Sequence, residues 1–332
     1  MKKTLKLLFI LLLVGVMAFS LVGCGGDNNG NNNNDPVDVE DVDDNEEQDI
    51  ALDSQEVLME AAKAYFDHIA AGNNNMTNFN DIKDMLDDDP NSVLIIDIRS
   101  AEDFEEGHIP GSVHSTRGKV GEIMDRIPRN IPVIIACYTG QNAGYTTAYL
   151  RMAGFDNVTS LFYGINLGWI ERGEYELEGE GMVAAADLPA VSEPRDEEEE
   201  IIWDAAKAYS NAIDEGEIGF IGVGEPQEDF YEMIQADPNS AVIYDIRRAN
   251  GEEHDYDSYH IEGAVHVAWG QFGEVLENMK TTVPVAVACY SGQTSAQTLG
   301  VLRMLGYDNA RSILYGVRDG WVTRSELPVV TP

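Results

Sequence analysis

The chain has 332 residues, more than one hydrophobic core usually serves, so we expect two domains of ordinary size. Its formal net charge of -38, from 59 acidic and 21 basic residues, leaves no basic stripe for phosphates and argues against nucleic-acid partners. A strongly acidic composition is typical of a protein kept soluble outside the cell.

The N-terminus has the features of an export signal. A basic start precedes an apolar run over residues 7–19, which is too short to cross a bilayer as a helix. Leu21-Val22-Gly23-Cys24 resembles the bacterial lipobox, in which the cysteine is lipidated. We predict a lipoprotein signal peptide over residues 1–23, lipidation of Cys24 and anchoring on the extracytoplasmic face of the cell membrane. An ordinary secretory signal is the alternative. We expect residues 24–50, rich in Asn, Asp and Glu, to form a disordered acidic tether.

From residue 51 onward, nearly every motif occurs twice. The separation of matched residues grows from 144 through 148 to 152, so the second copy contains two short insertions. A repeat this long indicates a duplicated domain, because solenoid repeats span only about 20–50 residues. We predict domains over residues 51–180 and 201–332, joined by an acidic linker over 181–200. The matches include Ala61–Tyr65 with Ala205–Tyr209, Asp97-Ile98-Arg99 with Asp245-Ile246-Arg247, His108 with His260, Cys137 with Cys289, and Trp169 with Trp321.

Each copy alternates the patterns of strands and helices. Segments such as 56–70 and 143–153 have the spacing and length of helices. The alternation predicts an α/β fold of two tandem domains, each a mainly parallel sheet flanked by helices. In such sheets, ligands bind at the carboxyl ends of the strands. Apolar, β-branched runs typical of strands buried on both faces lie at residues 93–96, 132–136, 241–244 and 284–288.

Each copy also places one cysteine directly after a buried strand, at the head of a glycine-containing loop that leads into a helix. Loop amides and a helix N-terminus stabilise negative charge, so we expect them to cradle an anion and to lower the pKa of both thiols. Such a thiolate can attack electron-poor sulfur and hold it as a persulfide. An inert buried cysteine and a Cys137–Cys289 disulfide are the alternatives. The loops are Cys137-Tyr138-Thr139-Gly140-Gln141-Asn142 and Cys289-Tyr290-Ser291-Gly292-Gln293-Thr294.

Each copy resembles a rhodanese domain in the order and spacing of its motifs. The motifs are Asp97–Arg99, His108–Gly111, Cys137–Asn142, Gly164 and Trp169, and in the second copy Asp245–Arg247, His260–Gly263, Cys289–Thr294, Gly316 and Trp321. The resemblance implies a sulfurtransferase in which Cys137 and Cys289 are the nucleophiles, residues 138–142 and 290–294 bind the substrate, and no cofactor is needed. Sulfane sulfur would pass from thiosulfate, a persulfide or a polysulfide to a thiol or cyanide acceptor.

The loops depart from this pattern in lacking Arg and Lys, which leaves the donor open between thiosulfate and a persulfide or polysulfide. The alternative function is a non-catalytic rhodanese-like lipoprotein that binds or senses a sulfur anion or a protein partner. Related phosphatases carry Arg six residues after the cysteine, where this chain has Ala143 and Ser295. Without that bidentate clamp we do not expect phosphatase activity.

The remaining repeated polar residues are predicted to be structural. We expect Arg99 and Arg247, which follow Asp97 and Asp245, to pair with nearby carboxylates such as Glu105 or Glu253 and so fix a turn. His108 and His260 begin matching turns, and their surroundings lack the ligand spacing of a metal site. We therefore predict no bound metal.

Overall fold

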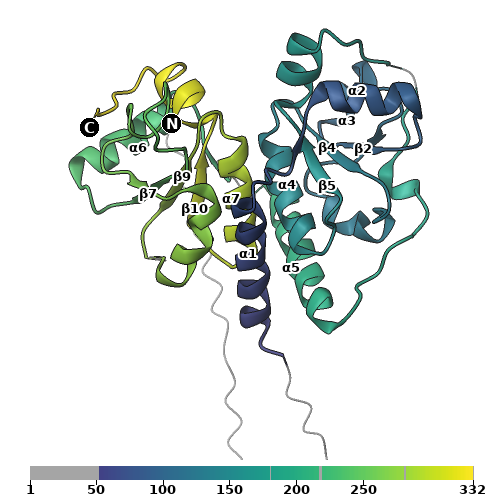
Figure 1. The fold of residues 1–332 in the computed structure, drawn as a ribbon, viewed down its shortest axis with the longest axis horizontal. Coiled ribbons are helices and arrows are strands. Elements are labelled where there is room, and N and C mark those ends of the chain that lie inside the picture. The colour runs from purple at the N-terminus through teal and green to yellow at the C-terminus, as the bar shows by residue number, and fades with distance from the viewer. Residues whose placement is uncertain (1–51, 180, 217–218, 280–281, 332) are drawn as a thin grey trace, which may run out of the picture. The chain divides into compact units, whose positions relative to one another are not determined.

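Two five-stranded sheets with parallel strands form the frame of the protein, and helices flank both of them (Figure 1). The computed structural model describes residues 52–179, 181–216, 219–279 and 282–331. The strand order is β1-β5-β4-β2-β3 in the first sheet and β6-β10-β9-β7-β8 in the second, so the two copies have the same topology. This confirms the predicted α/β fold. The predicted signal peptide, Cys24 and the tether lie outside the described residues.

The strands are short, and each of the four predicted apolar runs, at residues 93–96, 132–136, 241–244 and 284–288, overlaps one of them. The first sheet contains β1 (Met76–Thr77), β2 (Leu94–Asp97), β3 (Val113–His114), β4 (Val133–Ala136) and β5 (Val158–Leu161). The second contains β6 (Phe220–Ile221), β7 (Val242–Asp245), β8 (Val265–His266), β9 (Val285–Ala288) and β10 (Ala310–Ile313). All residues of β4 and β9 are buried, as expected for the central strand of a sheet covered on both faces.

Helices and short helical turns connect these strands. The α-helices are α1 (Ser54–Ala70), α2 (Phe79–Asp88), α3 (Ala101–Glu106), α4 (Gln141–Met152), α5 (Glu197–Asp214), α6 (Glu225–Ala236) and α7 (Gln293–Met304). The 3₁₀ segments are η1 (Val120–Arg126), η3 (Ala185–Asp187) and η4 (Trp269–Asn278), and the π-helical segments are η2 (Gly164–Arg172) and η5 (Gly316–Val322). α4 and α7 begin near the end of the two predicted cysteine loops, at Gln141 and Gln293.

Helix α5 begins inside the acidic stretch predicted as a linker. The Asp196 carboxylate caps the helix by accepting a hydrogen bond of 2.9 Å from the Glu199 N–H. Four glutamates fill the first turn, where the helix dipole favours negative charge. Glu199 is buried and paired with Arg129 at 2.9 Å and with Arg195 at 3.0 Å. Part of the acidic run therefore caps helix α5 and stabilises its first turn.

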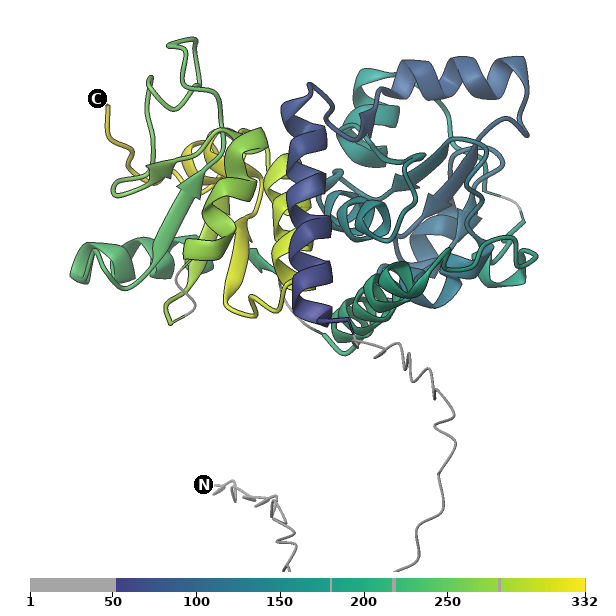
Figure 2. The ribbon, with the colours of Figure 1, turned by 60° about the horizontal axis from the view of Figure 1, so that its bottom comes forward.

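The first helix of each copy packs against the other copy. α1 lies on η4 of the second copy, and α5 lies on η1 of the first (Figure 2). The approach is close: a Cβ added at Gly270 would lie 2.6 Å from Ala70 Cα, and one added at Gly121 would lie 2.6 Å from Ser210 Cβ. The Gly121 N–H also donates to Ser210 Oγ at 3.0 Å. The two copies thus exchange their N-terminal helices.

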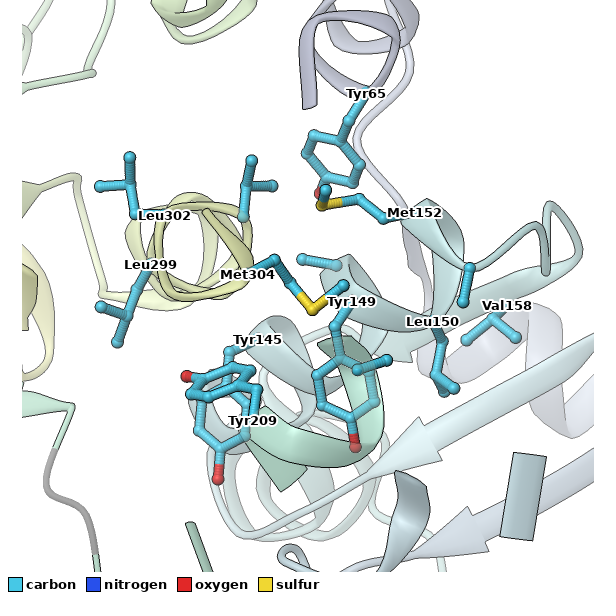
Figure 3. Packing of buried hydrophobic residues seen from close by; sticks show 14 of the residues in the cluster. Tyr65, Tyr145, Tyr149, Leu150, Met152, Val158, Tyr209, Leu299, Leu302 and Met304 are labelled. Atoms are coloured by element: carbon cyan, nitrogen blue, oxygen red, sulfur yellow. The ribbon is translucent and has the colours of Figure 1, made fainter. Parts of the chain in front are cut away.

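Helices α4 and α7 form the centre of the contact between the copies. Gly300 allows this approach, since a Cβ there would lie 2.7 Å from the Tyr145 carbonyl oxygen. Around the contact, Tyr145 and Tyr149 pack against Tyr209 of α5, with ring centroids 6.0 and 5.9 Å apart (Figure 3). One hydrophobic cluster therefore runs through both copies. Within the described ranges, no helix has the length and apolar character needed to cross a membrane.

Candidate active site

Both cysteines lie at the carboxyl end of the central strand of their sheet, inside the loops that the sequence predicted. Cys137 follows β4 and Cys289 follows β9, and each is 2% exposed. Both are free thiols, so they are not joined in a disulfide. Cys137 Sγ accepts hydrogen bonds from the N–H groups of Gly140 at 3.2 Å and Ala143 at 3.3 Å. Cys289 Sγ accepts them from Gly292 at 3.1 Å and Ser295 at 3.4 Å.

The loop glycine makes this cradle possible. Gly140 and Gly292 have φ values of 87° and 95°, in the left-handed region that favours glycine. This conformation turns the loop so that its amides and the first turn of the following helix point at the sulfur. Amides arranged in this way form an anion-binding nest. The predicted cradle is therefore present in both copies.

A second glycine turn supports each cysteine loop from behind. The Ile165 N–H donates to the Cys137 carbonyl oxygen at 2.8 Å, and the Val317 N–H donates to that of Cys289 at 2.7 Å. A Cβ at Gly164 would lie 2.6 Å from the Cys137 carbonyl oxygen, so only glycine fits there. The buried Trp169 and Trp321 follow these turns in η2 and η5.

The expected lowering of the thiol pKa is wrong for Cys137. Burial raises the pKa of this thiol above its ordinary value, and the N–H groups of Ala143, Thr139 and Gly140 offset the rise only in part. The sequence showed the amide donors but not the depth of burial. In this state Cys137 holds its proton more firmly than a free cysteine does.

Cys289 has a hydroxyl partner that Cys137 lacks. Ser295 Oγ lies 3.3 Å from Cys289 Sγ, 3.1 Å from the Gly292 carbonyl oxygen and 2.8 Å from Ser312 Oγ. The matching residue in the first copy is Ala143, which has no hydrogen-bonding side chain. The Ser312 hydroxyl can donate to Ser295 while Ser295 donates to a thiolate. The two cysteine sites therefore differ in chemistry although their loops have the same backbone conformation.

A cavity of about 730 Å³ lies beside Cys289. Its wall comes from both copies: Phe162 and Tyr163 from the first, and Arg248, Trp269, Tyr290 and Arg318 from the second. The Arg318 guanidinium pairs with Asp319 at 2.6 Å, and hydrogen bonds from it to Asp319 and to the Tyr163 side chain raise its pKa. Arg318 thus stays charged at the cavity wall.

Arg248 and Arg318 are not among the residues predicted from the sequence, because neither lies inside a cysteine loop. The repeat could have pointed to them, because the matching residues of the first copy, Ser100 and Asn166, are uncharged. Arg248 reaches the Cys289 cavity from the segment after β7 and Arg318 reaches it from η5, beside the ion-paired Arg247, so a loop without Arg or Lys does not leave this site without cations.

The other predicted substrate-binding residues have different roles: some hold the loops in place, some line the cavity, and some bond to the opposite copy. The Tyr138 and Tyr290 hydroxyls donate to Asp103 and Asp255, and accept from the N–H groups of Ser100 at 3.2 Å and Arg248 at 3.0 Å. These hydroxyls hold the loops in place and do not bond to the sulfur.

Ser291, Gln293 and Thr294 line the Cys289 cavity, while the Thr139 amide is a neighbour of Cys137. Gln141 and Gln293 form hydrogen bonds to the opposite copy.

The structural residues form buried turns, but their ion pairs differ from those expected. Arg99 Nη2 lies 2.7 Å from the Asp97 carboxylate and not at Glu105, and it also donates to the Gly107 carbonyl oxygen at 2.6 Å. In the second copy, Arg247 pairs with Asp245 at 2.7 Å and donates to the backbone carbonyl of His254, not to the Glu253 side chain. Pairing within the Asp-x-Arg motif itself fixes each turn.

The two predicted structural histidines lie within these turns. His108 Nδ1 is 2.8 Å from the Phe104 carbonyl oxygen and its ring stacks on Phe104. His260 Nδ1 is 3.2 Å from the Tyr256 carbonyl oxygen and its ring stacks on Tyr256. Over the part of the chain that the structure describes, no group of three or more His, Cys, Asp or Glu side chains could hold a metal ion.

Comparison with known proteins agrees with this architecture. The family described as the Rhodanese-like domain matches residues 78–170 and 226–323. The chain therefore belongs to the rhodanese-like family. The thiosulfate sulfurtransferase GlpE of Actinobacillus succinogenes is 37% identical over 82 residues, which are 25% of this chain and 73% of that protein. GlpE of Pseudomonas savastanoi pv. phaseolicola is 31% identical over 74 residues, 22% of this chain and 70% of that protein. These relatives support sulfurtransferase activity of the rhodanese type.

Solved structures that match this chain do so at low sequence identity. SseA from Escherichia coli, a 3-mercaptopyruvate sulfotransferase, is 20% identical with a TM-score of 0.33, over 73% of this chain and 98% of that one. A thiosulfate sulfurtransferase from Pseudomonas aeruginosa is 18% identical with a TM-score of 0.34, over 76% of this chain. This chain spans 45% of the length of the Pseudomonas aeruginosa protein.

Proposed function

We propose that this protein is an extracytoplasmic sulfurtransferase whose principal nucleophile is Cys289. The observation that supports this most is the placement of its thiol: Sγ sits in a nest of loop amides, 3.3 Å from the Ser295 hydroxyl, beside a cavity whose wall includes Arg248 and Arg318. Amide and hydroxyl donors stabilise a thiolate, and arginine binds the oxygens of an anionic donor. Cys137 has the same loop without the hydroxyl and acts as a second, slower site.

The transfer takes place in two displacements. With thiosulfate as donor, the Cys289 thiolate bonds to the outer sulfur, the sulfur–sulfur bond breaks, and sulfite leaves with the bonding electron pair. The loop amides then face the terminal sulfur of the cysteine persulfide. An acceptor thiolate, or cyanide, bonds to that terminal sulfur, and the Cys289 thiolate leaves with the electron pair. A persulfide or polysulfide donor reacts by the same step and releases a thiolate or a shorter polysulfide.

Intact-protein mass spectrometry tests this activity directly. Residues 50–332, which form one unit, are incubated with thiosulfate or polysulfide, with Cys137→Ser and Cys289→Ser variants alongside. We expect a gain of one sulfur atom that maps first to Cys289, disappears when a thiol is added, and in Cys289→Ser forms only slowly, at Cys137. No gain with any donor would favour a non-catalytic binding or sensing protein. The burial of both cysteines and the raised pKa of Cys137 are the observations that favour this second function.

The proposed location rests on the N-terminal sequence. The basic start, the apolar run over residues 7–19 and Leu21-Val22-Gly23-Cys24 support export and lipid anchoring at Cys24. We expect the wild-type protein to incorporate labelled fatty acid and to sediment with membranes in a bacterial host. Cys24→Ser should abolish the label. Unchanged labelling of Cys24→Ser would rule out this anchor.

A further inference from the structure

The glutamine that begins each helix after a cysteine loop forms hydrogen bonds to the opposite copy. Gln141 Oε1 accepts a hydrogen bond of 3.1 Å from the Tyr315 N–H. Gln293 Oε1 accepts one of 3.1 Å from the Tyr163 N–H, and its Nε2 donates to Ser160 Oγ at 3.0 Å and to the Leu161 carbonyl oxygen at 3.1 Å. Both glutamines are 2% exposed, so water does not compete for these bonds.

The tyrosines that these glutamines bind belong to the turns that support the cysteines. Tyr163 and Tyr315 have φ values of 63° and 61°, a left-handed conformation that is unusual for a residue with a side chain. Directly after Tyr315, the Val317 N–H donates to the Cys289 carbonyl oxygen at 2.7 Å and the Arg318 N–H donates to that of Tyr290 at 3.1 Å. The hydrogen bond from the Tyr315 N–H to Gln141 Oε1 therefore fixes the turn that holds the Cys289 loop.

The glutamine amides also touch the opposite loops. A Cβ at Gly292 would lie 2.6 Å from Gln141 Oε1, and one at Gly140 would lie 2.7 Å from Gln293 Cδ. Gly292 and Gly140 are the residues whose N–H groups donate to Cys289 Sγ and Cys137 Sγ. Each glutamine thus packs against the amide donor of the other copy's cysteine as well as against its supporting turn.

We propose that Gln141 and Gln293 are positioning residues that act in trans, Gln141 on the Cys289 site and Gln293 on the Cys137 site. This proposal rests on the proposed sulfurtransferase function only for its kinetic readout. Each site is complete only when the other copy is packed against it. Gln141 is held by its Oε1 alone, because its Nε2 is buried with no hydrogen-bond partner in the described structure.

The test compares the reactivity of both cysteines in the same molecule. The variants Gln141→Ala and Gln293→Ala of residues 50–332 are treated with iodoacetamide, and the alkylation of each cysteine is followed by peptide mass spectrometry. We expect Gln141→Ala to change the rate at Cys289 at least fivefold more than the rate at Cys137, and Gln293→Ala to give the opposite ratio. A change on the order of tenfold corresponds to the loss of one buried hydrogen bond.

A matched control separates positioning from a general loosening of the contact between the copies. Gln297 is also a buried glutamine on α7 that bonds to the other copy, through Tyr65 and the Asn74 carbonyl oxygen, but it does not touch a supporting turn. Gln297→Ala should leave the ratio of the two alkylation rates unchanged. A larger effect of each Gln substitution on its own copy's cysteine, or equal effects on both, would overturn the proposal.

Two further measurements separate the role of the glutamine acceptor from a loss of packing and from a loss of activity. Gln141→Met preserves the volume of the side chain and removes the acceptor, so it should reproduce the shifted ratio with less loss of stability than Gln141→Ala. In steady-state sulfur transfer by Cys137→Ser, which isolates the Cys289 site, adding Gln141→Met should lower kcat with little change in KM for the donor. If wild-type protein transfers no sulfur, the proposed function fails, while the alkylation ratios still decide the trans role. A normal ratio in Gln141→Met would also refute that role.

Discussion

Ser295 Oγ lies 3.3 Å from Cys289 Sγ, and Ala143 takes its place beside Cys137. A hydrogen bond to a charged group contributes about 1.5–3 kcal/mol, so loss of this hydroxyl destabilises the thiolate of Cys289. We expect Ser295→Ala to slow alkylation of Cys289 at neutral pH by about tenfold. The reverse change, Ala143→Ser, should accelerate alkylation of Cys137. Equal rates for wild type and Ser295→Ala would show that the hydroxyl serves only Gly292 and Ser312.

Arg318 provides a positive charge at the Cys289 cavity, where the first copy has Asn166. Replacing it by the residue of the first copy, Arg318→Asn, should raise KM for thiosulfate several-fold and change kcat less, because the lost interaction acts on the bound dianion. The dependence of KM on ionic strength should also weaken, since salt screens charge interactions at an open cavity. Steady-state kinetics at two salt concentrations measure both effects. An unchanged KM would exclude Arg318 from donor binding.

The buried Cys137 thiol makes stability depend on pH. Because burial raises the pKa of this thiol in the folded state, the native protein binds the proton more tightly than the unfolded chain does. This contribution is complete at neutral pH and is lost as pH rises above the ordinary thiol value of about 8.5. We therefore expect the free energy of unfolding to fall more steeply between pH 8 and pH 9.5 in wild type than in Cys137→Ala. Urea titrations at several pH values measure the difference, and parallel curves would contradict it.

The exchanged helices leave no room for a side chain at Gly270, where a Cβ would lie 2.6 Å from the Ala70 backbone. Gly270→Ala must push α1 away from η4, and overpacking of this kind costs roughly 1–3 kcal/mol. Gly222→Ala is a matched control, because its Cβ would meet only Pro226 Cγ at 3.5 Å, an ordinary contact. Thermal unfolding of both variants compares them. A Gly270→Ala protein as stable as the control would show that α1 is loosely held.

The local features of the fold could be predicted from the sequence, but the contacts between distant segments could not. β4, β9 and the cysteine loops follow from apolar runs and glycines that are adjacent in the chain. The packing of α1 on η4 depends on two surfaces far apart in sequence, and the helical pattern of α1 does not say which surface covers it. The raised pKa of Cys137 and the arginines at Cys289 escaped prediction for a similar reason, because burial and a shared cavity depend on the assembled fold.

Because α1 packs on η4, it reaches its final environment only after the second copy has been synthesised. Ala70 and Trp269 are 199 positions apart, so the ribosome completes α1 long before it makes the segment that covers it. At typical rates of synthesis this interval is roughly ten to forty seconds. α5, in contrast, emerges when its own partner η1 already exists. During that interval the side of α1 that packs on η4, with Phe66, lacks its partner Phe272. A chain truncated between the copies would carry this face permanently uncovered.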